Sequence, residues 1–339
     1  MGGSPGAPRY GNGKTPMSNS INTNSQALIA LQSLNTTNSQ LSVTQKRVST
    51  GYRVADARDD GGAFAVAQAV RSDVAGVIAV GEQLGGTKGI LQTSFAALSV
   101  VSDTMKQIRA ALTRLADGAI SADQRQTYEE QYELLTGQVA SFIDDAFYNG
   151  RTLLSTDLSK GGGDITAIRN ESGGTFAIEA VDGQLMKLAP DAFEITTADL
   201  TALTTAAAAK YTAALPPGGP AWNTLSDTQK QTYIDAEIFN EKVSRATAAV
   251  KSGGAFDTAD RLISSALNQF GSSMAFVDNQ IKYNSQKVDA MEGGLGALVD
   301  ADLAKESSTL EALKVRQQLG VQTLGLANQG PQVLLGLFR

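Results

Sequence analysis

Apolar residues recur in alternating steps of four and three along much of this chain. The longest such run covers residues 63–112, with small residues early and larger ones late. Shorter runs cover residues 128–146 and 263–291. This spacing keeps one apolar stripe on a helix face and is typical of coiled coils. The sequence therefore predicts long helices in a coiled-coil-like bundle. Segments that are far apart in the chain should pack together to complete it.

The two ends of the chain carry a weaker version of the same pattern. Leu34, Leu41 and Val48 recur every seven residues among amide and hydroxyl side chains. A helix predicted from Leu303 onward has apolar residues on two opposite sides, whereas a surface helix of a monomer needs one stripe. We therefore expect the second side to pack against something else. The first side holds Leu303, Leu310, Leu313, Val321 and Leu324, and the opposite side holds Val315, Leu319 and Leu326.

Capping and turn residues predict where several helices begin and end. Ser121–Gln124 and Ser226–Gln229 are capping boxes, and the second should start a helix that runs to about Val250. Asn149-Gly150 and the Gly-Gly after Met291 should end two of the bundle helices. The glycines between Gly81 and Gly89 should interrupt the longest helix. A phosphate-binding loop is the other explanation of a glycine-rich stretch, but no complete phosphate-binding motif occurs there.

The middle of the chain has a different pattern. Residues 164–188 alternate and carry turn signals at Asn170–Gly174 and Asp182-Gly183, which predicts a small β-meander. The Ser/Thr-rich stretch Thr196–Thr205 is expected to be an exposed loop or helix start, with O-linked sugar as the alternative. A Pro/Gly-rich linker follows at residues 215–220. We therefore place a small inserted α+β outer domain at residues 160–254 of a mainly α fold.

Composition narrows the possible chemistry. The chain has 339 residues, a formal net charge of −6, no cysteine and no histidine. Thiolate and imidazole chemistry is therefore excluded, whereas carboxylate, lysine or serine-lysine chemistry stays open as an alternative. We expect no enzyme activity, no cofactor and no metal. The acidic balance disfavours nucleic acid and anionic membranes as partners, and we find no apolar run long enough to span a bilayer. Residues 1–16 are rich in Gly and Pro and are expected to be a disordered extension before Met17.

A charge-rich elbow separates the N-terminal helix from the longest run. Its composition alone fits a solvated joint, whereas a family resemblance carried by motifs at both ends of the chain implies ion pairs there within or between subunits. The residues proposed for such pairs are Arg47, Arg53, Arg58, Asp59 and Asp60.

Motifs at both ends resemble those of bacterial flagellin. The N-terminal matches are Ile21–Asn24, the stretch Arg47–Val54 and the pair Asp59-Asp60. The C-terminal matches are residues 301–306 and 327–329 and the apolar end at residues 334–337. The resemblance implies a structural subunit that polymerises into a motility filament, with a hook–filament junction protein as the alternative. It also implies secretion by the flagellar export apparatus without a cleaved signal peptide, and hook-junction, cap and chaperone partners.

The resemblance also implies a division of the chain. The segment 17–60 would form an N-terminal inner coiled-coil helix and spoke, and residues 297–339 its C-terminal partner. Segments 61–159 and 255–296 would form the helical bundle. Nine residues are expected to carry self-assembly through the terminal helices: Leu34, Leu41, Val48, Leu310, Leu313, Val315, Leu319, Leu324 and Leu326.

Overall fold

The computed structural model describes residues 24–215 and 219–337, with side chains described to Gln329. The expected extension at residues 1–16, most of the Ile21–Asn24 motif and the apolar side chains at 334–337 lie outside this description, as does the centre of the 215–220 linker. The prediction of a mainly α chain is confirmed. The elements are α1 (Ser25–Thr50), α2 (Gly61–Leu115), α3 (Ala122–Asp144), η1 (Leu158–Lys160), β1 (Ile165–Ile168), β2 (Thr175–Ile178), η2 (Gly183–Met186), α4 (Thr197–Ala214), η3 (Trp222–Thr224), α5 (Asp227–Val250), α6 (Ala255–Val299) and α7 (Leu303–Leu337).

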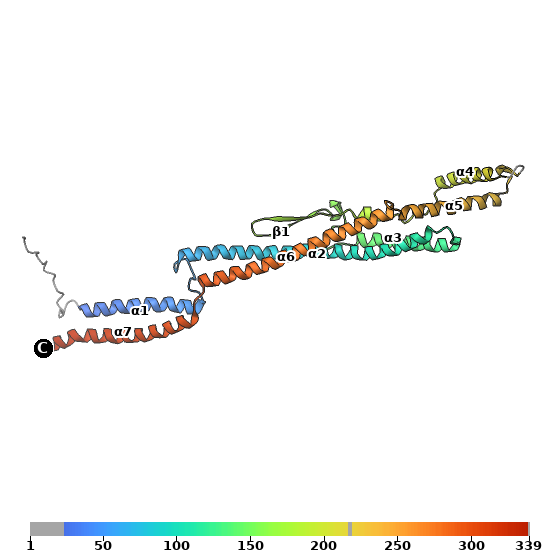
Figure 1. The fold of residues 1–339 in the computed structure, drawn as a ribbon. Helices are drawn as coiled ribbons and strands as arrows, with labels where there is room; N and C mark the ends of the chain where they lie inside the picture. The colour runs from blue at the N-terminus through green and yellow to red at the C-terminus, as the bar shows by residue number, and fades with distance from the viewer. Residues whose placement is uncertain (1–23, 216–218, 338–339) are drawn as a thin grey trace, which may run out of the picture. The chain divides into compact units, whose positions relative to one another are not determined.

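The chain divides into two compact units, one made of Met1–Val74 with Ala290–Arg339 and the other of Ala75–Asp289. We call them the terminal unit and the bundle unit. In the terminal unit α1 and α7 lie side by side (Figure 1). They are antiparallel, because the start of α1 contacts the far part of α7 through Asn24 and Ala327, and its end contacts the start of α7 through Arg47 and Glu306.

Local signals define both ends of α1. The Asn24 side chain accepts a hydrogen bond from the backbone N–H of Ala27 at 3.0 Å, which caps the helix start. Gly51 ends the helix with a φ of 75°, and its N–H donates to the carbonyl of Arg47. Glycine adopts this left-handed conformation without the steric cost that a side chain would add.

A small core and a backbone bridge follow α1 in the terminal unit. Val54, Ala67 and Val299 are buried together. The backbone N–H of Arg53 donates to the carbonyl of Val299 at 2.7 Å, and that of Ala301 donates to the carbonyl of Gly51 at 2.9 Å. The end of α1 is therefore tied to the connection between α6 and α7.

The bundle unit contains the main hydrophobic core. Leu84, Leu91 and Leu98 on α2 recur every seven residues and are fully buried. Residues of α3 and α6, including Val139 and Phe270, complete this core. Not every residue of the expected α3 stripe points inward: Phe142 is 38% exposed, and its neighbour Ile143 is buried in its place.

Both expected capping boxes are present, but two expected helix ends and one expected helix interruption are wrong. Asn149 and Gly150 have φ values of 50° and 73° and form a separate turn five residues after α3 has ended. Helix α6 continues through Gly293-Gly294 to Val299, and α2 continues through Gly81–Gly89. A helical glycine costs about 1 kcal/mol, which tertiary packing outweighs here.

One glycine of α2 has a packing reason. A Cβ atom added to Gly89 would lie 2.6–2.9 Å from ring atoms of Tyr148. The Tyr148 ring therefore rests directly on the backbone of α2, where any side chain would collide with it. No atom lies within 4 Å of the same position at Gly85 or Gly86.

The middle segment is simpler than the expected meander. Strands β1 and β2 form one antiparallel hairpin, with Ile165 opposite Ile178. Asp182 and Gly183 open the short helix η2 instead of a second turn, because the Asp182 side chain caps the N–H of Gln184. Helices α4 and α5 pack on each other, and Thr196, at the head of the Ser/Thr-rich stretch, caps the start of α4.

Helix α2 is the one described helix that is long and apolar enough to cross a membrane, judged by length and composition alone. Polar residues interrupt its apolar stretches, so no uninterrupted apolar run marks this helix in the sequence. The same helix carries the buried heptad stripe of the bundle unit, and core helices of soluble proteins pass the same test.

Candidate assembly surface of the terminal helices

The inner face of the α1–α7 pair brings six of the nine expected assembly residues together. Leu34, Leu41 and Val48 are half-buried on α1, in register with buried Thr37 and Thr44. On α7, Leu310 and Leu324 are half-buried and Leu313 is 5% exposed. We call these contacts the inner seam.

Glycine and amide residues that the sequence analysis missed also belong to the inner seam. A Cβ atom on Gly320 would lie 3.2 Å from Cδ1 of Leu34, so the leucine fills the space over the glycine. The Gln317 side chain donates to Oδ1 of Asn38 at 2.8 Å. Heptad spacing from Leu310 and Leu313 already leads to positions 317 and 320. Gln317 and Gly320 carry no apolar side chain, so the spacing of apolar residues alone does not predict them.

The outer face of the pair holds the remaining three expected residues. Val315 and Leu319 are each more than half exposed, and Leu326 is 67% exposed. Leu303 and Val321, assigned to the inner side by the helical wheel, are also exposed. A wheel with 3.6 residues per turn drifts away from a seam that repeats every 3.5 residues, which explains Val321, one position beyond Gly320. Leu303 keeps the heptad spacing with Leu310 but is the first residue of α7. Helix α1 adds exposed Leu28, Ile29, Leu31 and Val43.

A groove of about 430 Å³ runs between α1 and α7 on one side of the pair. Val43, Ala312 and Leu313 contribute apolar surface to it, and Arg47 and Arg316 contribute cations. An apolar groove with charged edges has the character of a site for an amphipathic helix.

In the elbow, Lys46 is the central cation, and the sequence analysis did not single it out. Its Nζ lies 2.8 Å from Asp56 and 2.8 Å from Asp59. The Asp59 carboxylate also accepts the backbone N–H groups of Ala55 and Asp56. The Lys46 hydrogen bond, helped by the one from Ala55, lowers the pKa of Asp59 from 3.8 to about 2.

The expected elbow residues have separate roles. Arg47 forms an ion pair with Glu306 at 3.1 Å, and Arg53 donates from its side chain to the carbonyl of Leu298. Asp60 accepts the N–H of Ala63 and caps the start of α2. The Arg58 side chain forms no ion pair with any described residue. The Arg47–Glu306 ion pair could not be predicted from the sequence, because its two residues are 259 positions apart.

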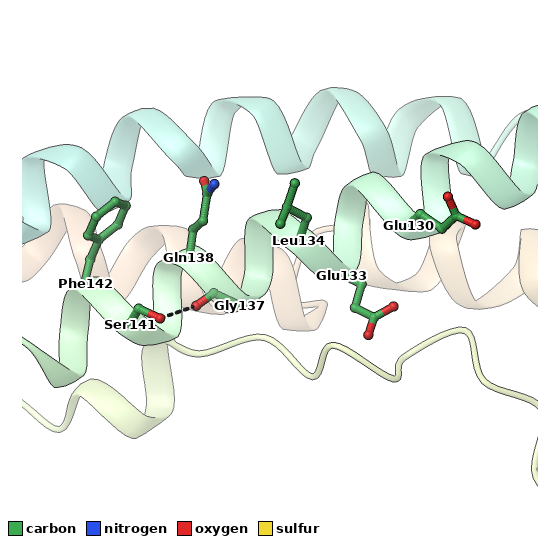
Figure 2. Close-up of a pocket in the computed structure, with 7 residues that line it drawn as sticks. All are labelled: Glu130, Glu133, Leu134, Gly137, Gln138, Ser141 and Phe142. Carbon is green, nitrogen blue, oxygen red and sulfur yellow. Dashed lines mark hydrogen bonds between the residues drawn. The ribbon is translucent and has the colours of Figure 1, made fainter.

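The bundle unit has a groove of about 580 Å³ between α3, the segment 190–195 and α5, and a separate hollow on α3 alone. Figure 2 shows its hollow on α3, and all seven residues that line it belong to that one helix. Leu134, at its centre, is 64% exposed. Catalytic pockets draw polar groups from several elements, so this hollow is an exposed helix face. Among residues 24–215 and 219–337, no group of three acidic side chains could hold a metal ion.

Comparison with known proteins places both helical regions in one family. Residues 21–158 match the family described as "Bacterial flagellin N-terminal helical region", and residues 254–338 match "Bacterial flagellin C-terminal helical region". Flagellin FljK of Caulobacter vibrioides is 30% identical, over 95% of this chain and 99% of its own. A flagellin of Brucella melitensis is 31% identical, over 94% and 99%.

One solved structure with similarity is that of a putative flagellar hook-associated protein from Vibrio parahaemolyticus. It is 12% identical, covers 71% of this chain and all of its own, and gives a TM-score of 0.45. A score this low carries no argument about function.

Proposed function

The chain belongs to the bacterial flagellin family, and we propose that the two faces of its α1–α7 pair are the surface through which copies assemble. As a flagellin it is a structural subunit of the flagellar filament, an extracellular motility structure. Self-assembly is therefore its function, and no catalytic chemistry is needed for it.

The outer face is the observation that carries this proposal. In a monomer the exposed side chains of Val315, Leu319 and Leu326 would face water although each could bury apolar area. Exposed large apolar side chains that recur on one side of a helix are typical of a protein interface. The inner seam would join α1 and α7 within one copy, and the outer face would contact neighbouring copies.

Contacts between two different faces do not close on themselves. Head-to-tail interfaces of this type extend into rings or open helices, according to the rotation between copies. An open helix gives a filament. The groove beside Arg47 and Arg316 would accept part of a terminal helix from a neighbour. The Arg58 side chain, which forms an ion pair with no described residue of its own copy, would pair with a carboxylate across the interface.

The division of the chain follows the same logic. Residues 17–60 and 297–339 would form the inner coiled coil, 61–159 and 255–296 the bundle, and 160–254 the outer domain, with 1–16 as an extension. We also propose that the chain binds hook-junction proteins, cap proteins and an export chaperone. Its export would need no cleaved signal peptide.

Truncation after Leu324 tests the proposal. We expect the truncated chain to keep the thermal unfolding of the bundle unit, because none of the described side chains of α7 between Leu324 and Gln329 belongs to that core. We expect it to form no filaments after seeding, as judged by electron microscopy. Filaments of normal length from the truncated chain would contradict the assembly role of this segment.

A hook–filament junction protein is the alternative. Such a protein would form short rings of copies, whereas a filament subunit would form long polymers from seeds. The similarity of the chain to flagellins over nearly its whole length supports the filament subunit. Electron microscopy of the seeded protein distinguishes the two functions. Long polymers would support the filament subunit, and short rings without long polymers would support the junction protein.

A further inference from the structure

Arg125 is a buried cation in the bundle unit, and the proposed assembly surface gives no reason for its burial. It lies in the first turn of α3 and is 4% exposed. Arginine is almost never fully buried unless it is paired, yet no carboxylate lies within ion-pair distance of Arg125 among the described residues. Its partners are instead backbone carbonyls and an aromatic ring.

The guanidinium holds the connection between α2 and α3. Its Nη1 donates to the carbonyl of Leu115 at 2.7 Å, and its Nη2 donates to the carbonyl of Asp117 at 3.0 Å. Leu115 is the last residue of α2, where carbonyls lack partners within the helix and the helix dipole favours a positive charge. Arg125 therefore caps α2 from the beginning of α3.

The same guanidinium also contacts α5. Its central carbon lies 4.2 Å from the centroid of the Phe239 ring, close enough for a cation–π interaction. One turn further along both helices, Lys242 forms a 2.7 Å ion pair with Glu129, and both side chains are about one-fifth exposed. These two adjacent contacts connect the middle of α5 to α3, whereas the end of α5 is held separately, because Ala246 is buried in the bundle core.

Helix α4 is attached to α5 in turn. Arg245 on α5 lies 3.0 Å from the carboxylate of Asp199, and Lys210 on α4 lies 2.5 Å from Glu237. The placement of both helices on the bundle thus depends on what fixes α5.

We propose that Arg125 is the positioning residue that holds α5, and with it α4, on the junction of α2 and α3. Arginine suits this role because its planar fork reaches two carbonyls while its face stacks on a ring. A lysine ammonium in the same place would satisfy one carbonyl at a time and would not stack in the same way.

The test measures amide hydrogen exchange of the monomer in three variants: Arg125→Lys, Arg125→Met and Phe239→Leu. In all three we expect exchange in α5 to rise by about tenfold, because each change removes at least one contact of the guanidinium. Exchange in the buried part of α6, around Ile263 and Phe270, should stay unchanged. The monomer suffices, so the result does not depend on whether the terminal helices drive assembly.

Arg114→Lys is the matched control. Arg114 also lies over a ring, 5.1 Å from the centroid of Tyr128, but it is exposed and makes no contact with α5 among the described interactions. Unchanged α5 exchange in Arg125→Lys or in Phe239→Leu would overturn the proposal. An equal rise in α5 and α6 would also overturn it, since Arg125 would then stabilise the core as a whole. Should Arg125→Met fail to fold, the other two variants still decide.

Discussion

Two helix seams in this chain share one spacing and differ in what fills it. In the bundle unit, heptad positions on α2 hold Leu84, Leu91 and Leu98, all fully buried. In the terminal unit, the matching positions on α1 alternate leucine with threonine, as at Leu34 and Thr37, and the leucines are only half-buried. Spacing thus determines which faces pair, and side-chain size determines how much the pairing stabilises.

The difference has a thermodynamic meaning. Full burial of a leucine side chain contributes about 1.5–3 kcal/mol, whereas ordering each backbone residue costs about 1–2 kcal/mol. The bundle unit has an extensive core to offset that cost. The inner seam has few large side chains along the 26 residues of α1. The terminal pair should therefore need the burial of its outer face by other copies to become stable.

The largest expected effect is in the bundle unit. Leu98→Ala leaves a cavity in a fully packed position and should lower the free energy of unfolding of the monomer by about 3–5 kcal/mol. Leu313→Ala, in the inner seam, is the matched change. Urea unfolding of the monomer should detect the first change and hardly detect the second. Equal losses would mean that both seams stabilise the monomer.

The next effect concerns the outer face. Leu319→Ser should leave monomer unfolding unchanged, because that side chain is exposed in the single chain. It should weaken each subunit contact by on the order of 2 kcal/mol, or about thirtyfold in the critical concentration for polymerisation. Sedimentation of seeded filaments over a range of concentrations measures this.

Leu134→Ser is the matched control for the outer face. Leu134 is also more than half exposed, but it lies on α3 of the bundle unit and outside the α1–α7 pair. This variant should polymerise at the critical concentration of the unmodified chain. The same thirtyfold rise in both variants would mean that any lost surface leucine weakens assembly, and that the outer face has no special part in it.

A smaller effect distinguishes two glycines of α2. Gly89→Ala requires the Tyr148 ring to move, because the new methyl group would lie 2.6–2.9 Å from the far end of that 43% exposed side chain. Gly85→Ala should stabilise the monomer by about 0.5–1 kcal/mol, since the position is open and alanine favours helix. Thermal unfolding should show a smaller gain, or a loss, for Gly89→Ala, and an equal gain in both variants would contradict the packing of Tyr148.

The smallest effect is the pH response of the elbow. The pKa of Asp59 is lowered to about 2 in the folded chain, below its usual 3.8. The Lys46–Asp59 contact therefore stabilises the elbow fully above about pH 4, and this contribution is lost as the pH falls through 2. Asp59→Asn should reduce that dependence in the hydrogen exchange of residues 46–60, and Asp56, whose pKa the Lys46 hydrogen bond also lowers, should keep the rest. An unchanged acid response in the variant would assign it to another group.

Sequence reasoning succeeded where spacing alone carries the structure. The heptads predicted the long helices, and the capping boxes at Ser121 and Ser226 predicted two helix starts. It failed where a local signal competes with packing, as at Gly293-Gly294, through which α6 continues. Contacts between distant residues, such as Arg47 with Glu306 or Arg125 with Phe239, leave no periodic trace in the sequence and could not be predicted.

Amide hydrogen exchange of α1 and α7, measured in the dilute monomer and in the assembled filament, tests the central claim most directly. The account predicts fast exchange in both helices of the monomer and strong protection in the filament, while α2 and α6 of the bundle unit are protected in both states. Protection of α1 and α7 in the monomer at the level of the bundle core, unchanged on assembly, would contradict it.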